Sequence, residues 1–211
     1  MLTYFGKTQR AAGSLDVNAT VQAVRGYWEA LRPAGAVPLR SDVDARGMAD
    51  CLEKVFLIER IAPGQARFRL AGMQLAEIMA MDVRGMPLTA LFEPQARARV
   101  SEELERVFAE PSILEIWLEA ERGLGRSALD GRMLILPLRE TGNAPALALG
   151  CLACHGRIGR APRRFAVSGM LRELIAPPRP QPVAPAAVSA PPAPARVVPG
   201  RPWLRLVSSL D

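Results

Sequence analysis

The chain has 211 residues, of which 49% are hydrophobic, and this composition supports one real core or at most two small ones. The formal net charge is +6, but about half of the excess lies in residues 176–211, so the rest of the chain lacks the strong basicity of a nucleic-acid-binding domain. No stretch approaches about 18 apolar residues, which excludes a membrane span, and no apolar run follows Lys7 and Arg10. We therefore expect a cytoplasmic protein whose three cysteines are reduced thiols.

The N-terminal part of the chain is expected to hold a flexible segment over residues 1–16 and then two helices. Apolar side chains at helical spacing predict a helix over residues 17–32, which ends before Pro33. Polar residues ahead of Ala45–Glu53 are typical of a capped helix start. The apolar positions of the first helix are Val21, Val24, Trp28 and Leu31, and the capping candidates are Ser41, Asp42 and Asp44.

A pair of strands is predicted next, over Lys54–Ile61 and Ala66–Ala71, joined by a turn with Pro63 and Gly64. In the second strand two arginines alternate with two apolar residues. This alternation predicts one solvent-facing side and one buried side. The arginines are Arg67 and Arg69, and the apolar residues are Phe68 and Leu70.

A block of helices and then a block of strands follow. The helical segments are Gly72–Met81, Leu88–Phe92 and Pro94–Ala109, and the strands are Ser112–Glu121, Met133–Leu138 and Pro145–His155. Strands grouped apart from helices indicate an α+β domain with an antiparallel sheet, which we expect to span residues 17–175.

The composition changes after residue 175. Residues 176–202 are rich in proline and alanine, which predicts an extended, disordered linker. Residues 203–211 form a short apolar C-terminal segment. Its residues 203–207 are either a frayed end or a segment that docks on a sheet edge or in a partner groove.

The order and spacing of these elements resemble a PAS domain over about residues 20–155. More narrowly, the chain is similar to a bacterial family of small stand-alone PAS-like proteins formerly catalogued as a domain of unknown function. In place of the aromatic residue and glycine that the family tends to carry after its first long helix, this chain has Met79 and Ala80. The residues that carry the resemblance are Tyr27, Trp28, Leu31, Pro38 to Asp44, Phe68 to Gly72, Gly85 and Leu136 to Leu138.

The resemblance implies a five-stranded antiparallel sheet with helices covering one face, and residues 17–32 would be a flanking helix. It also implies a non-enzymatic sensory or protein-interaction module, for signal transduction through a small-molecule ligand or a partner. A protein partner or a homodimer would use residues 17–32 or the tail at 203–207, and no cofactor is expected.

Six apolar residues are expected in the core, and they would line a ligand pocket if the core contains one. They are Phe68, Leu70, Met79, Phe92, Leu118 and Leu136. Two groups of carboxylates, Glu102, Glu103 and Glu105 and then Glu115, Glu119 and Glu121, are interpreted as surface groups. With one histidine, no catalytic triad and no phosphate-binding loop, hydrolase or nucleotide-transfer chemistry has little support.

The run Cys151-Leu152-Ala153-Cys154-His155 has the spacing of a c-type haem attachment site, and it has no counterpart in the family. The alternatives are a haem site, a zinc site that also uses Cys51, a redox-sensing thiol, and two buried core thiols. In a strand the two cysteines, three positions apart, point to opposite faces, so the predicted strand favours core thiols.

A run of arginines follows this segment, with no acidic residue between Glu140 and Glu173. The run contains Arg157, Arg160, Arg163 and Arg164. It suggests a binding site for phosphate, for nucleic acid or for an acidic partner. A solvated segment after the sheet is the simpler interpretation. Association with nucleic acid through Arg157–Arg164 is therefore only an alternative function.

Overall fold

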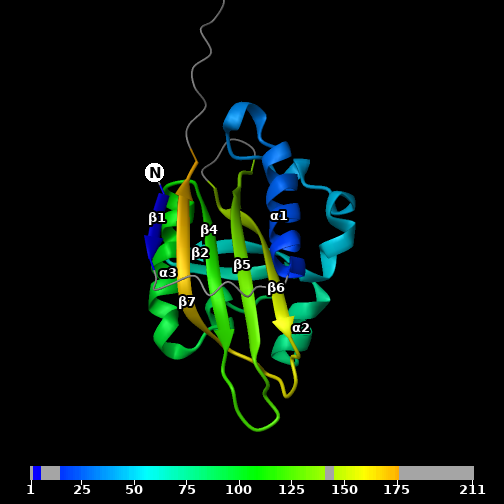
Figure 1. Ribbon diagram of the computed structural model, residues 1–211. Helices are drawn as coiled ribbons and strands as arrows, with labels where there is room; N and C mark the ends of the chain where they lie inside the picture. Colours follow the sequence, from blue (N-terminus) through cyan, green and yellow to red (C-terminus); the bar gives the residue numbers. More distant parts are fainter. Residues whose placement is uncertain (1, 6–14, 141–144, 176–211) are drawn as a thin grey trace, which may run out of the picture. The chain divides into compact units, whose positions relative to one another are not determined.

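A computed structural model describes residues 2–5, 15–140 and 145–175 (Figure 1). Its strands are β1 (Leu2–Phe5), β2 (Val55–Ala62), β3 (Gln65–Ala71), β4 (Ser112–Ala120), β5 (Leu129–Leu138), β6 (Leu147–Gly156) and β7 (Phe165–Leu174). The α-helices are α1 (Leu15–Ala30), α2 (Met73–Met79) and α3 (Pro94–Ala109), and the 3₁₀ helices are η1 (Pro33–Gly35), η2 (Arg40–Asp42), η3 (Ala45–Lys54) and η4 (Leu88–Leu91). None of the helices in these ranges is long and apolar enough to cross a membrane.

The strands form one antiparallel sheet in the order β1-β7-β4-β5-β6-β2-β3. The predicted α+β class is confirmed, but five strands was too few, because β7 and β1 extend the sheet beyond β4. Strand β1 lies within residues 1–16, where no element was predicted. The predicted domain boundaries are not tested by the structure and stay predictions. The predicted linker at 176–202 and the C-terminal segment at 203–211 lie outside the described residues.

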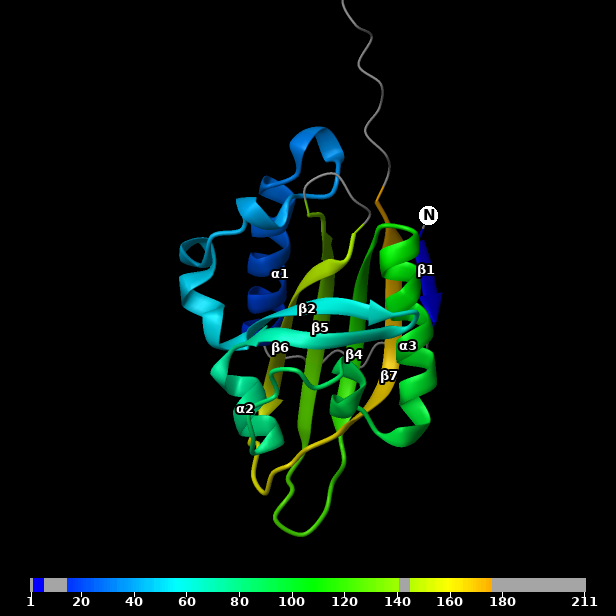
Figure 2. The same cartoon turned by 180° about the vertical axis from the view of Figure 1, so that it is seen from behind.

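Each face of the sheet is covered by helices, and this divides the core into two parts. Helix α1 lies against β5 and β6 on the face seen in Figure 1. Figure 2 shows the opposite side, where α2 and α3 lie and where the hairpin of β2 and β3 runs crosswise to the other strands. We call these two parts the α1-side core and the helical-block core. Burial on both faces explains why β4, β5 and β6 are almost entirely buried along their length.

Helix α3 shows why the sequence alone predicted the helical block well. Proline at its first position, apolar residues on one side and Pro111 beyond its end define the helix, and Val100, Leu104 and Val107 are buried. The capped helix start predicted before Ala45 is present, with Asp44 as the cap, but the segment is a 3₁₀ helix interrupted at Met48 by non-helical backbone angles.

Candidate functional site

The segment with the haem-attachment spacing is strand β6, as predicted, and its cysteines lie on opposite faces of the sheet. Cys151 is fully buried in the α1-side core. Cys154 is half-buried against the helical-block core, and His155 is exposed. Because the two thiols point away from each other, Cys151, Cys154 and His155 do not form one ligand set for haem or zinc.

Cys51 does not complete such a set either. It lies in the α1-side core, on the same side of the sheet as Cys151 and on the side opposite to Cys154. Across the described residues there is no group of three or more histidine, cysteine, aspartate or glutamate side chains that could hold a metal ion.

Burial also makes the thiols of β6 poor nucleophiles. Desolvation raises the pKa of Cys151 to about 12, and desolvation likewise raises the pKa of Cys154 to about 12. Burial raises the pKa of Cys51 in the same direction. A redox-sensing thiol requires a low pKa and access to solvent, so these cysteines behave as small core residues.

We predict that at neutral pH Cys151 reacts with iodoacetamide about a thousandfold more slowly in the folded protein than in denaturant. The reason is that a thiol with a pKa of about 12 forms far less thiolate than an unfolded cysteine with a pKa of about 8.5. Mass spectrometry after timed labelling checks this rate. The same shift makes the folded state less stable as the pH rises from about 8.5 to 12, because only the unfolded thiol loses its proton there. Rapid labelling of Cys151 in the native protein would contradict its burial.

The six candidate pocket residues separate into three locations. Four of them, Phe68, Met79, Phe92 and Leu118, come together in the helical-block core, where each is at most 5% exposed. Phe68 packs edge-on against Phe56, with ring centroids 5.4 Å apart. On the helical-block side of the sheet, these positions are therefore occupied by tightly packed side chains.

The remaining two candidates lie elsewhere. Leu136 is in the α1-side core, on the opposite face of the sheet. Leu70 was expected to be buried beside Phe68, but it is 52% exposed. The cause is a register shift between Leu57 and Ile58 in the pairing of β2 with β3, which interrupts the alternation of buried and exposed residues.

Leu70 instead lines an open apolar groove of about 530 Å³ beneath η3. Three exposed apolar side chains surround it: Leu52 of η3, Leu70 of β3 and Met73 of α2 are 45%, 52% and 67% exposed. Arg40 and Arg84 also line the groove. Its apolar floor and walls include Val43, Met48, Val55, Leu57, Ala71 and Leu149.

This groove was not predicted from the sequence, because its lining comes from six separate helices and strands and from the loops between them. Of the six candidate pocket residues, only Leu70 lines the groove. Leu52 and Met73, which are apolar residues at the junctions of helices with strands, were not singled out. Neither has a periodic apolar neighbour that marks it as part of a site.

Two close contacts hold η3 between α1 and α2. A Cβ atom at Gly47 would lie 2.1 Å from the ring of Tyr27 on α1, so η3 and α1 meet at a position that only glycine fits. At the other end of η3, a Cβ atom at Gly72 would lie 2.2 Å from the Glu53 carbonyl oxygen. The helix η3 is therefore closely packed against α1 near its start and against the residue that precedes α2 at its end.

Hydrogen bonds reinforce the contact between η3 and α1. The Tyr27 hydroxyl donates to the Asp44 carbonyl oxygen at 2.9 Å and accepts from the Asp44 amide at 2.7 Å. The Asp44 side chain in turn accepts from the amide of Arg46, which caps η3. The start of η3 is thus tied to the aromatic side chain that its Gly47 contacts.

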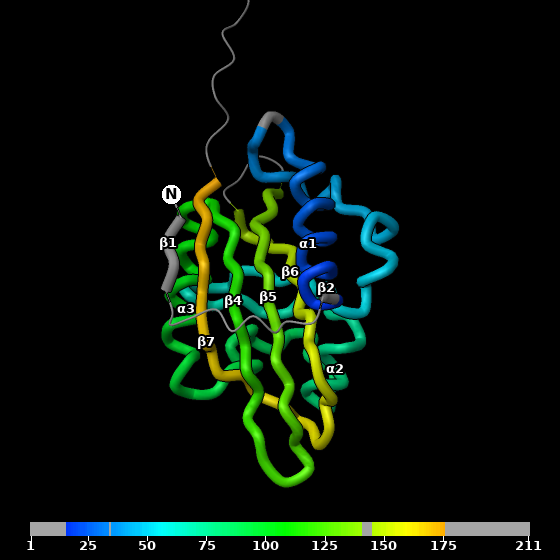
Figure 3. Tube along the Cα trace, in the orientation of Figure 1, coloured from blue at the N-terminus to red at the C-terminus, as the bar shows by residue number. Residues whose placement is uncertain are grey.

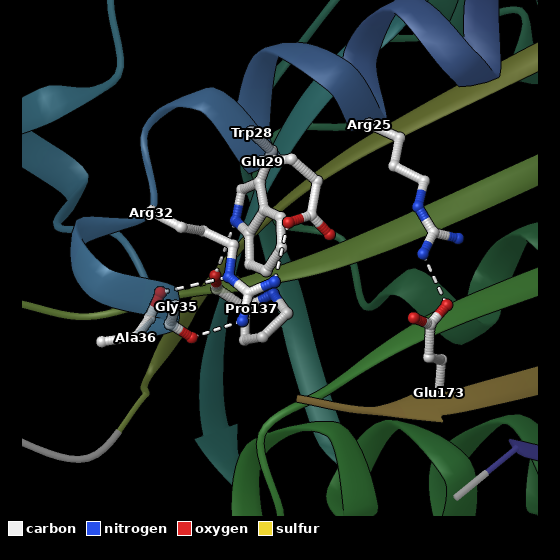
Figure 4. Close-up of polar contacts among 8 residues, drawn as sticks. All are labelled: Arg25, Trp28, Glu29, Arg32, Gly35, Ala36, Pro137 and Glu173. Carbon is white, nitrogen blue, oxygen red and sulfur yellow. Dashed lines mark hydrogen bonds and ion pairs between the residues drawn. The ribbon is translucent and has the colours of Figure 1, made fainter. Parts of the chain in front are cut away.

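Helix α1 is fixed to the sheet by polar contacts as well as by its apolar face (Figure 4). The indole of Trp28 donates to the Pro137 carbonyl oxygen of β5 at 3.0 Å. Arg25 forms an ion pair with Glu173 of β7 at 2.5 Å. Arg32 reaches back to Glu29 at 2.7 Å and also donates to the carbonyls of Gly35 and Ala36.

The arginine run is only partly a solvated segment, because Arg163 is fully buried. Its guanidinium donates to the carbonyl oxygens of Ile158, Glu121 and Ser127. Desolvation lowers its pKa. Arg163 therefore has a structural role that contradicts the predicted surface position, whereas Arg157, Arg160 and Arg164 are exposed.

The prediction that the two groups of glutamates lie at the surface is wrong for some of them. Glu105 is half-buried and forms an ion pair with Arg60 at 2.6 Å, which lowers the pKa of the carboxyl. Glu103 and Glu115 were expected at the surface, but they are 5% and 6% exposed. Glu115 is covered because α1 packs on its face of the sheet, where it pairs with Arg132.

A family model described as a PAS domain matches residues 17–153. No curated protein and no solved structure matches the chain significantly. The matched residues run from the start of α1 to the middle of β6 and so include η3 and the apolar groove.

Proposed function

The chain belongs to the PAS domain family, and from this we propose that it is a non-enzymatic sensory and interaction module whose input site is the apolar groove beneath η3. The observation that carries the proposal is the groove itself, which has a volume of about 530 Å³ and a mostly apolar lining. A volume of this size accommodates a small organic ligand.

The groove is the better candidate for a ligand than the interior of the helical block. Phe68, Phe92 and Leu118 are almost completely buried against their neighbours, so a ligand there would have to displace core side chains. In contrast, Leu52, Leu70 and Met73 are exposed in the groove, and covering them with an apolar ligand is favourable.

The same groove offers a route from ligand to output. Met48 and Leu52 belong to η3, which contacts α1 through Gly47 and Tyr27. A ten-residue 3₁₀ segment with a kink has poorer backbone hydrogen bonding than an α-helix, so it is a suitable element to exist in two packings. A ligand that favours one packing shifts the population, and α1 reports the shift.

The outer face of α1 supports its role as the reporting element. Ala19, Ala23, Gly26 and Ala30 are exposed and follow one another at helical spacing. Such small side chains allow the backbone of another helix to approach closely. We therefore retain residues 17–32 as the contact region for a protein partner or a second copy.

The proposal is tested with the neutral apolar dye Nile red. We expect saturable binding with one dye molecule per chain and reduced hydrogen exchange in η3 and at Tyr27 when dye is bound. Leu70→Glu places a charge in the groove and is expected to weaken binding at least about tenfold, which corresponds to about 1.4 kcal/mol.

The matched control is Ile61→Glu, because Ile61 is 51% exposed on neighbouring β2 but does not line the groove. This variant should bind dye as the parent chain does. Equal weakening by both substitutions, or binding that leaves the exchange of η3 and α1 unchanged, would count against the groove as the input site.

A further inference from the structure

Two loops at one end of the sheet form a single basic surface, and their residues belong neither to the groove nor to α1. Residues 121–128 connect β4 to β5, and residues 157–164 connect β6 to β7. Figures 1 and 3 show these connections side by side at the lower end of the sheet. The segments are joined by backbone contact, since the amide of Arg160 donates to the Gly125 carbonyl at 2.9 Å.

Arginine side chains hold the two loops together. Arg126 donates to the carbonyl oxygens of Arg160 at 3.3 Å and Pro162 at 3.2 Å. The buried Arg163 donates to Glu121 at 2.8 Å and to Ser127 at 2.9 Å, so one guanidinium spans both loops. These cross-links fix the loop backbones relative to each other, and the exposed side chains therefore project from a well-defined base.

The surface carries much more positive than negative charge. Residues 121–130 and 157–164 contain six arginines but only two carboxylates, Glu121 and Asp130. Glu121 is already paired with Arg126. Four exposed arginines, Arg122, Arg157, Arg160 and Arg164, form no ion pair with any residue that the structure describes.

An apolar residue stands among these charges. Leu124 is 94% exposed at the tip of the loop from β4 to β5, the most exposed large hydrophobic side chain in the described part of the chain. It lies between Gly123 and Gly125, and Gly125 has a φ of +74°, which favours glycine there. The loop geometry thus presents Leu124 outward beside Arg160, whose Cβ lies 3.6 Å from the position of a Cβ at Gly125.

We propose that Leu124 and the exposed Arg122, Arg157, Arg160 and Arg164, here called the arginine platform, dock an acidic protein segment that has an apolar contact for Leu124. Arginines around an apolar anchor are the residue pattern of protein interfaces, in which charge complementarity accelerates association and the anchor is buried. A phosphate backbone would gain nothing from a projecting leucine, so the geometry favours an acidic protein over nucleic acid. The arginine platform is a second site, separate from the ligand groove proposed above.

The test uses two short glutamate-rich peptides of equal charge, one carrying leucines and the other serines at the same positions. Binding to the full chain is measured by fluorescence anisotropy at near-physiological ionic strength. We expect the leucine peptide to bind more tightly. Arg160→Glu should weaken both peptides about tenfold, and Leu124→Ser should bring the leucine peptide to the level of the serine peptide.

Arg46→Glu is the matched control, because Arg46 is exposed on η3 and the substitution changes the net charge equally. It should leave peptide binding unchanged. Equal effects of Arg46→Glu and Arg160→Glu, or no difference between the peptides, would overturn the proposal. So would duplex DNA or anionic vesicles that bind more tightly than the leucine peptide and depend in the same way on Arg160.

Discussion

Replacing Trp28 by alanine is expected to lower the free energy of unfolding by about 4 kcal/mol, within the range of about 3–5 kcal/mol for removing a large buried aromatic side chain. Trp28 is the largest fully buried side chain in the described residues and lies in the α1-side core. The substitution removes its packing and also leaves the Pro137 carbonyl without its indole donor. The guanidinium carbon of Arg32, 5.2 Å from the centre of the Trp28 ring, also loses its aromatic contact.

Equilibrium denaturation by urea measures this loss, and Trp28→Phe separates its components. Phenylalanine keeps an aromatic ring in the core but cannot donate to Pro137, so we expect a smaller loss of about 1–3 kcal/mol. Both variants should increase hydrogen exchange in α1, because Trp28 connects the helix to β5. A loss below about 1 kcal/mol in Trp28→Ala would show that α1 is not fixed in this way.

The regular elements were predictable because local sequence signals agree with their tertiary environment. Helix α3 carries a proline at its first position and a single apolar side, and the structure places Pro94–Ala109 as a helix with that side buried. Strand β6 was predicted although Pro145–His155 is rich in alanine and leucine. In the structure, Gly150 lies so close to Phe56 that a Cβ would be 2.2 Å from the ring.

The missing strand β7 and the buried Glu115 have a common explanation. A pattern along one segment shows which of its residues are apolar, but not how many layers cover the segment. Phe165–Leu174 contains Ser168 and Gly169 and has no clean alternation, yet it pairs with β4 over its whole length. Glu115 alternates with apolar residues as a solvent-facing residue does, but α1 covers that face.

The candidate site was the least predictable part, because it depends on irregular backbone. The exposure of Leu70 follows from a register shift, which has no residue signature in the strand itself. The groove that Leu70 lines requires η3 to end against Gly72 at the start of α2. Single residues such as Leu52 and Met73 acquire a role only when these segments are brought together.

Glu115→Ala is expected to lower the free energy of unfolding by about 3–5 kcal/mol, because it leaves a largely buried guanidinium without its anion. The side chains of Arg132 and Glu115 are 17% and 8% exposed. Arg132 also donates to Asn18 on α1, and its guanidinium lies 5.4 Å from the centre of the Trp117 ring. Desolvation already lowers the pKa of Arg132, so removal of the carboxylate leaves its charge more poorly compensated.

The double variant Glu115→Leu with Arg132→Met distinguishes this explanation from simple loss of packing. It removes both charges and retains apolar volume, so it should recover most of the stability that Glu115→Ala loses. Glu59→Ala is the exposed control: its ion pair with Arg67 spans 3.1 Å between side chains that are 32% and 50% exposed, and we expect a loss below about 1 kcal/mol. If the double variant is as unstable as Glu115→Ala, the cost arises from shape rather than from an unpaired charge.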